Sequence, residues 1–324
     1  EKVNYPGGFR RFNTAENFPE IGGRKVVSYF EFKEGSAPLE IKVALSAVGT
    51  DGAVKNLQAE ATGKSFDTIR QETNGKWENA LSVIDAEGSN DQLSMLYTSL
   101  YHTMINPSVY MDVDGKYRGI DHNIHQAEGF TNYTVFSVWD TYRALHPLFN
   151  IIKRDVSTDL VKSMLAHYSQ SVHHLLPVWS HMGNENWCMI GYHSVSVLAD
   201  AITKGLPIDK QEVKAMVSSS NVPYYDHTDE YKQLGYVPFD QSPTSASITL
   251  ENAYEDWTVY HTALLLGDKQ IADTYKKRAL YYRNVFKPGL GFACPRYKDG
   301  SWKEEIDLLS THGQGFIEGN AWNY

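Results

Sequence analysis

The chain has 324 residues, 42% hydrophobic and 21% charged, a composition typical of a globular protein rather than a disordered or fibrous one. Its 39 acidic and 30 basic side chains give a formal charge of -9 without any basic stripe, which argues against nucleic acid and anionic membrane surfaces as partners. No apolar run approaches the roughly 18 residues that a membrane helix needs.

Residues 1–85 are predicted to form β-structure. The segment LEIKVALSAV, residues 39–48, alternates apolar and polar side chains at the period of a strand with one buried face. RKVVSYFEF at 24–32 and ALSVIDAEG at 80–88 read as further extended runs, and GTDG at 49–52 has the composition of a turn. Such strands normally pair in an antiparallel sheet or sandwich with one solvated face.

Helical periodicity begins near residue 90. In DQLSMLYTSLYHTM, residues 91–104, apolar side chains recur at i, i+3, i+4, i+7, i+8 and i+11, which makes one continuous stripe. Similar stripes lie at 156–168 and 271–286, and Asp209 and Glu212 stand in capping-box positions. No convincing strand series follows, so the sequence predicts a β domain followed by an all-α domain with long loops.

Four loop-like segments concentrate polar and aromatic side chains of the kinds that form binding sites, and we call them the site-like segments. The whole chain carries 21 Tyr and 7 Trp. Aromatic rings in such numbers suit sugar recognition, or they simply fill a large core. The first segment, YMDVDGKYRGIDHNIH at 110–125, does not fit an EF-hand, because Gly115 is fourth rather than sixth and Asn123 replaces the twelfth-position Glu. His122 and His125 either bind a metal whose third ligand is not identified or are ordinary loop residues.

The second segment, FSVWDTYRALHP at 136–147, places Trp139, Asp140 and Arg143 at the start of a helical run. One interpretation is a helix N-terminus, where the negative charge of Asp140 interacts favourably with the helix dipole and Trp139 is buried. The other is a sugar site, where Trp139 stacks on the ring and Asp140 accepts hydrogen bonds from two hydroxyls. Both interpretations stay open on these residues alone.

The third segment, PVWSHMGNENWCMIGYHS at 177–194, precedes an apolar helix and combines two Trp with Glu185, Asn186, Cys188 and His193. Cys188 and His193 are residue types of a nucleophile–base pair, although a cysteine is commonly a small buried hydrophobe. Two cysteines in the whole chain exclude a disulfide scaffold. The polar loop as a whole is predicted to be functional.

The fourth segment, GFIEGNAWNY at 315–324, places Glu318, Asn320 and Trp322 among glycines. Glycine beside a carboxylate lets backbone and ligand approach it closely. An indole nearby lowers the local polarity, a condition that keeps a carboxylic acid protonated and able to act as a general acid. A capping glutamate in an aromatic loop is the alternative interpretation.

Taken together, eight strings resemble those of glycoside hydrolase family 92, the calcium-dependent, inverting, exo-acting α-mannosidases. A single string would be weak support, whereas eight in the family's order over nearly the whole chain are specific. They are NLQAE, LYTSLYHT, DVDGKYRG, FSVWDTYRALHP, LPVWSHMGNENWCMIGYHS, ENAYEDW, PRYKDGSW and EGNAWNY.

The resemblance implies an amino-terminal β-sandwich joined to an (α/α)6 barrel, with the active site between the two. On this pattern residues 1–88 are the C-terminal part of the sandwich, 89–130 a linking helix and loop, and 131–324 an incomplete barrel. The chain would then begin inside the sandwich and stop inside the barrel.

The resemblance also implies roles for single residues. Glu318, in EGNAW, corresponds to the general acid, and Asp140, in WDT, to the residue that binds hydroxyls of the mannose being released, with Trp139 beside it. Asn323 stands where Gln is usual in the family. Further substrate contacts are predicted at Arg143, Glu185, Asn186, Cys188, His193, Asn320 and Trp322.

The family's general base and main calcium ligands belong to motifs beyond residue 324, so Ca²⁺ is implied as a cofactor while no metal ligand is assigned within this chain. The isolated chain is therefore expected to lack activity. The implied substrates are α-mannoside glycans, specifically α-1,2-linked mannose of N-glycans or mannans. The implied location is the periplasm or cell surface of a bacterium.

Two other classes of protein compete with this interpretation. The first is a glycan-binding fragment or paralogue that keeps the aromatic loops without turnover. The second is another (α/α) barrel enzyme, a glucoamylase-like hydrolase or a polysaccharide lyase, and a lyase would need a Tyr, His or Lys proton shuttle. The ordered family strings favour the mannosidase.

Overall fold

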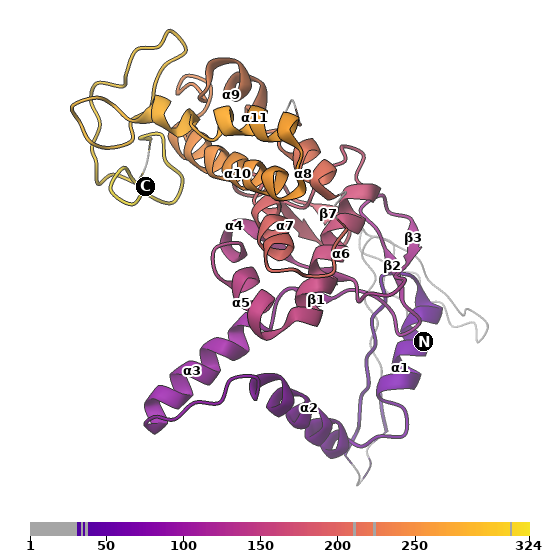
Figure 1. The fold of residues 1–324 in the computed structure, drawn as a ribbon. Coiled ribbons are helices and arrows are strands. Elements are labelled where there is room, and N and C mark those ends of the chain that lie inside the picture. Colours follow the sequence, from indigo (N-terminus) through magenta and orange to yellow (C-terminus); the bar gives the residue numbers. More distant parts are fainter. Residues whose placement is uncertain (1–30, 34, 36–37, 210–211, 223–224, 312) are drawn as a thin grey trace, which may run out of the picture. The chain divides into compact units, whose positions relative to one another are not determined.

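The computed structural model describes residues 31–33, 35, 38–209, 212–222, 225–311 and 313–324 (Figure 1). The chain divides into two compact units, residues 1–42 and 43–324. The second unit carries every helix and strand of the described residues, and none of these helices is long and apolar enough to cross a membrane.

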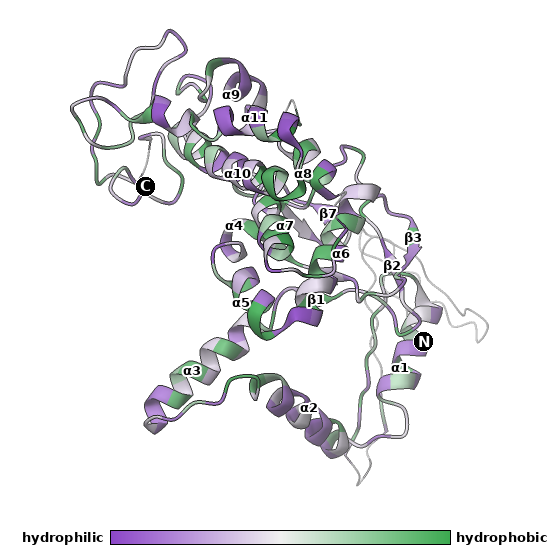
Figure 2. Ribbon diagram, viewed as in Figure 1, coloured by the Kyte–Doolittle hydropathy of each residue, from purple (hydrophilic) through white to green (hydrophobic). Residues whose placement is uncertain are grey.

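Between residues 38 and 89 the structure has two helices and no strand, although β-structure was predicted for residues 1–85. These helices are α1 (Thr50–Glu60) and α2 (Phe66–Leu81), and residues 38–107, all of which are described, contain no strand. Helix α2 buries none of its residues and is largely polar (Figure 2). The Ser65 hydroxyl caps its first turn by accepting from the Thr68 N–H (3.2 Å).

Three strand predictions have different outcomes. Those for 39–48 and 80–88 are wrong, because neither range forms a strand and the second begins with the end of α2. The run 24–32 lies almost wholly outside the described residues. The β-sandwich and the boundary at residue 88 stay predictions.

The predicted turn at 49–52 is instead the start of α1, and Gly52 serves close packing there. A Cβ at Gly52 would lie 2.1 Å from Oδ2 of Asp112 and 2.5 Å from Oγ of Ser46. The Asp112 carboxylate accepts hydrogen bonds from Ser46 (2.7 Å) and from the amide of Asn56 (2.8 Å). The DVDG string therefore fixes its loop against α1.

The predicted helices are confirmed, with changes at their ends. Helix α3 (Asn90–Thr103) begins with a capping box formed by Ser89 and Gln92. The stripe at 156–168 lies in α6 (Arg154–Gln170), and the run after Asp209 forms α8 (Val213–Ser219). The stripe at 271–286 is divided between two elements, α11 (Lys269–Arg278) and the 3-10 helix η2 (Tyr281–Val285).

The described residues after 90 were predicted to be all-α, yet they contain seven short strands in antiparallel pairs that link the loops. Two pairs are β1–β4 and β2–β3, and the third sheet has the order β5-β6-β7. In that sheet Phe136 pairs with Ser180, and Ser180 pairs with Glu185, which brings two of the site-like segments side by side. The strands are β1 (Ser108–Val109), β2 (Lys116–Arg118), β3 (Ile124–Gln126), β4 (Tyr133–Thr134), β5 (Phe136–Ser137), β6 (Trp179–His181) and β7 (Asn184–Glu185).

Helix α10 (Ser245–Leu266) is the main support of the site. It packs against α7 (Ser194–Thr203) and α11 (Figure 1), and α7 is largely hydrophobic (Figure 2). Unusually for a helix so deeply packed, α10 also buries the acidic side chains of Glu251, Glu255 and Asp256. The other helices are α4 (Val138–Thr141), α5 (Leu145–Ile152) and α9 (Thr228–Leu234).

Candidate active site around Glu251

Helix α10 brings two carboxylates onto one buried histidine. Glu251 and Glu255, four residues apart, lie on the same helix face and are 5% and 0% exposed. Nδ1 of His193 lies 2.6 Å from Oε1 of Glu255, and Nε2 lies 2.9 Å from Oε2 of Glu251. Because carboxylates only accept hydrogen bonds, both ring nitrogens donate, as in an imidazolium.

The charge of His193 is set by these two neighbours. Burial alone would lower the pKa of the imidazole, but Glu255 and Glu251 outweigh burial and raise the pKa of His193 to about 9. The ring of Tyr142 stacks on the imidazole, with the centroids 4.3 Å apart and the planes nearly parallel. The histidine is therefore a fixed internal cation at neutral pH.

Glu251 also accepts hydrogen bonds from residues of the second and fourth site-like segments. Its Oε2 accepts from the indole N–H of Trp139 (3.0 Å), and its Oε1 accepts from the hydroxyl of Tyr324 (2.7 Å). The guanidinium of Arg143 lies 3.6 Å from Oε1 and also covers the Trp139 ring, 5.1 Å from its centroid. The structure thus brings the predicted site residues Trp139, Arg143 and His193 together.

Asp140 and Glu318 lie at the surface of this arrangement. Both are exposed, and neither side chain makes a hydrogen bond or ion pair within the part of the chain that the structure describes. Ile317, next to Glu318, packs on the same buried cluster as Trp139. Glu318 is therefore a solvent-accessible carboxyl on a segment anchored beside Trp139, not a group enclosed in packed interior.

Glu185 and Asn186 have structural contacts in the third segment. The Glu185 carboxylate accepts from the backbone N–H groups of Val178, Trp179 and Trp187 at 2.8–3.1 Å. The Asn186 amide donates to the Trp179 carbonyl (3.1 Å). Their contacts fix the β6–β7 turn, and a substrate contact by either residue stays a prediction.

The conceivable Cys188–His193 nucleophile pair does not form. Both ring nitrogens of His193 are bonded to glutamates, so the imidazole has no free nitrogen with which to activate a thiol. Cys188 itself is exposed and carries a free thiol. Its predicted substrate contact is untested by these distances.

Asn320 and Trp322 occupy different positions in the fourth segment. Asn320 folds the segment, since its side-chain oxygen Oδ1 accepts hydrogen bonds from the backbone N–H groups of Trp322 and Asn323 (both 3.1 Å). Its amide donates to the Leu309 carbonyl (3.0 Å). Trp322 is 67% exposed, so most of its ring is available to a ligand.

Sequence reasoning missed Glu251 and Glu255. Both lie in ENAYEDW, where their spacing of four places them on one helix face, a signal that could have been read. Asp226 was missed as well. Burial raises the pKa of this carboxyl to about 6, while its Oδ2 accepts from the Gly191 N–H (3.0 Å).

The loop at 110–125 forms no metal centre in the described residues. His125 bonds to Asp121 (2.9 Å), and His122 lies 3.3 Å from the Asn184 side-chain oxygen. Across the described ranges no three His, Cys, Asp or Glu side chains group as metal ligands.

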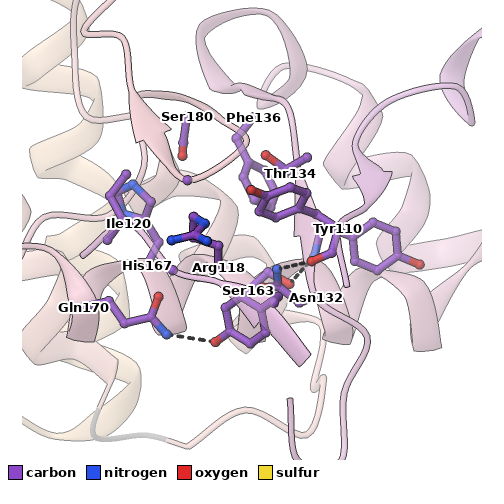
Figure 3. Close-up of a pocket in the computed structure, with 14 residues that line it drawn as sticks. Tyr110, Arg118, Ile120, Asn132, Thr134, Phe136, Ser163, His167, Gln170 and Ser180 are labelled. Atoms are coloured by element: carbon purple, nitrogen blue, oxygen red, sulfur yellow. Dashed lines mark hydrogen bonds between the residues drawn. The ribbon is translucent and has the colours of Figure 1, made fainter. Parts of the chain in front are cut away.

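A small hollow beside α6 is lined by side chains that do not include Glu251, and Figure 3 shows it. Its volume of about 30 Å³ accommodates water but not a sugar ring. Gln170 donates to the Tyr117 hydroxyl (2.8 Å) and Asn132 donates to the Tyr110 carbonyl (2.9 Å) at its edge. This hollow is therefore not a sugar site.

Comparison with known proteins supports one family. The model of the glycosyl hydrolase family 92 catalytic domain matches residues 52–324. The family GH92 alpha-mannosidase BT3965 from Bacteroides thetaiotaomicron, solved with mannoimidazole, is 41% identical with a TM-score of 0.83, over 86% of this chain and 38% of that one. The family GH92 inverting mannosidase BT2199 from Bacteroides thetaiotaomicron VPI-5482 is 32% identical with a TM-score of 0.80, over 86% and 39%.

A curated relative agrees at lower similarity. It is an uncharacterized secreted glycosidase of Arthroderma benhamiae, 23% identical over 330 residues, which cover 90% of this chain and 38% of the relative. The chain thus spans 38–39% of the length of these relatives.

Proposed function

This chain belongs to glycosyl hydrolase family 92, and we propose that it contributes the general acid and the mannose-binding side chains of an inverting exo-α-mannosidase. The observation that carries the proposal is the meeting of three site-like segments at Glu251, two of which carry the exposed carboxyls of Asp140 and Glu318. Similarity to an alpha-mannosidase and an inverting mannosidase supports the substrate class. We propose α-1,2-linked mannose of N-glycans or mannans as the substrate.

The proposed reaction uses different carboxyl groups as the acid and as the base. In inverting hydrolysis one acid protonates the departing oxygen while a base activates water on the opposite face, with the two carboxyls about 6.5–9.5 Å apart. We assign the acid to Glu318, which is exposed and without an internal partner in the described residues. Asp140 would accept hydrogen bonds from mannose hydroxyls beside the Trp139 ring. We assign no base among these 324 residues.

Ca²⁺ belongs to the proposal only through the family. A calcium site needs 6–8 oxygen ligands, and no group of three candidate ligands forms in the described ranges. The described residues therefore offer no cluster of carboxylates for the ion, and no step is assigned to it. Export from the cell is also a proposal, supported by the relative that is a secreted glycosidase.

Substitution of Glu318 tests the proposed acid. Turnover is measured on the longest natural polypeptide that includes these 324 residues. With Glu318→Gln, hydrolysis of an α-1,2-linked mannobiose should fall about 10²–10⁴-fold, because its alcohol leaving group needs a proton. An aryl mannoside with an acidic phenol leaving group should lose far less.

The control is Glu304→Gln, a change of another exposed glutamate in the carboxy-terminal loops, which should retain activity on both substrates. Full activity of Glu318→Gln on mannobiose would rule out its role as the acid. Mannose binding by the unaltered protein without any turnover would favour the glycan-binding alternative.

A further inference from the structure

The carboxylate of Glu251 connects three segments of the chain whose relative positions matter for the proposed reaction. One oxygen accepts from Trp139 and His193, and the other accepts from Tyr324, all within 3.0 Å. With the residue only 5% exposed, this carboxylate is occupied by protein donors and not by solvent or substrate. Its contacts are therefore those of a positioning group.

The segment 315–324 is attached to α10 on both sides of Glu318. On the near side the Gly315 carbonyl accepts from the backbone N–H groups of Ala246 (2.9 Å) and Ser247 (3.1 Å), and the Ile317 N–H donates to the Ser247 hydroxyl (3.1 Å). On the far side Tyr324 reaches Glu251, four residues along the helix from Ser247. One face of α10 thus carries both anchors.

The ring of Tyr324 also packs against its own segment. A Cβ on Gly319 would lie 3.1 Å from Cε2 of Tyr324, so glycine at 319 lets the ring approach the residue that follows Glu318. The ring lies 5.5 Å from that of Phe316, centroid to centroid, and the Tyr324 N–H donates to the Asn320 carbonyl (3.2 Å). Movement of the Tyr324 ring would therefore be transmitted to Glu318.

Glu318 itself has a backbone conformation that needs such support. Its φ of 44° lies in the left-handed region, which is unfavourable for a residue with a side chain. Conformations of this kind persist where the surrounding structure fixes them. The two anchors on α10 supply that constraint.

We propose that Glu251 is a positioning residue that fixes the segment 315–324 through the Tyr324 hydroxyl and thereby sets the place of Glu318 relative to Trp139. The catalytic part of this inference rests on the proposed function. The attachment itself is a statement about the fold that can be measured without substrate.

Hydrogen exchange on the 324-residue chain tests the attachment. Tyr324→Phe removes only the hydroxyl, and a hydrogen bond to a charged group contributes about 1.5–3 kcal/mol, so amides of residues 316–323 should exchange at least about tenfold faster. Amides of α10 and α3 should be unchanged. The control, Tyr97→Phe on α3, removes a hydroxyl that donates to the Ile84 carbonyl (3.0 Å) and should leave exchange at 316–323 unaffected. Unaltered exchange at 316–323 in Tyr324→Phe would overturn the proposal.

Kinetics on the longest natural polypeptide then test positioning. Tyr324→Phe should lower kcat on mannobiose about 10–100-fold, as a small misplacement of an acid does, while KM changes less than about threefold. The loss should be smaller on the activated aryl mannoside. Faster exchange with an unchanged kcat would overturn the positioning role. If the unaltered protein hydrolyses neither substrate, the proposed function fails, while the exchange result still decides whether the attachment exists.

Discussion

Raising the pH should weaken the fold through the buried His193. Burial would lower the pKa of this imidazole, but Glu255 and Glu251 raise it to about 9 in the folded protein, against about 6.5 in the unfolded chain. The folded state therefore binds the proton more tightly. The resulting stabilisation is complete below pH 6.5, declines as the pH rises toward 9, and is lost above it.

The size of the effect follows from the two pKa values. Their separation corresponds to about 3 kcal/mol of unfolding free energy, a large part of the 5–15 kcal/mol typical of a folded domain. Because His193 is only 2% exposed, solvent screening reduces the effect little.

The assay is urea unfolding of the unaltered chain and of His193→Gln at half-unit steps from pH 6 to 10. Glutamine keeps hydrogen-bonding capacity but cannot carry the charge, so groups distant from His193 cancel in the difference, whereas Glu251 and Glu255, which contact it, are measured together with it. At pH 6 the unfolding free energy of the unaltered chain should exceed that of His193→Gln by about 3 kcal/mol. This difference should shrink steadily up to pH 9.5. A difference that does not change with pH would refute the reasoning.

Two further substitutions test buried contacts of the fold. Arg278→Met leaves the buried Asp256, which Arg278 contacts at 2.9 Å, without its cation and should cost about 3–5 kcal/mol in unfolding free energy, whereas the exposed Arg283→Met should change it by less than about 0.5 kcal/mol. Equal losses from the two arginines would contradict the buried ion pair. Gly52→Ala, whose Cβ would meet Asp112, should cost about 1–3 kcal/mol, while Gly75→Ala in open space on α2 should stabilise by about 0.5–1 kcal/mol, both measured by thermal unfolding. A stabilising Gly52→Ala would show that the contact with Asp112 is absent.

Local patterns predicted the helices whose apolar faces are buried. Helix α6 buries Leu160 and Met164 completely, so its stripe was visible in the sequence. Helix α2 buries nothing, and its polar composition gave no stripe to detect. The alternation at 39–48 was misread because a period of two indicates a strand only when a neighbouring strand pairs with it.

The sequence predicted the site residues that lie in loop-like segments but not Glu251, the residue that they contact. Trp139, Arg143 and His193 stand in segments rich in polar and aromatic residues, which drew attention to them. Glu251 lies inside a long helix, where an acidic residue normally faces solvent. Its contacts with Trp139 and Tyr324 join positions 112 and 73 residues apart, which no local pattern reveals.

A crystal structure of the protein with mannoimidazole, the ligand solved with a similar alpha-mannosidase, would test the central claim most directly. We expect the Glu318 carboxyl within about 3 Å of a ring nitrogen of the bound ligand and Asp140 bonded to its hydroxyls, with the Tyr324 hydroxyl still bonded to Glu251. A ligand bound elsewhere, or one bound beside Trp139 with Glu318 turned away from it, would contradict the account.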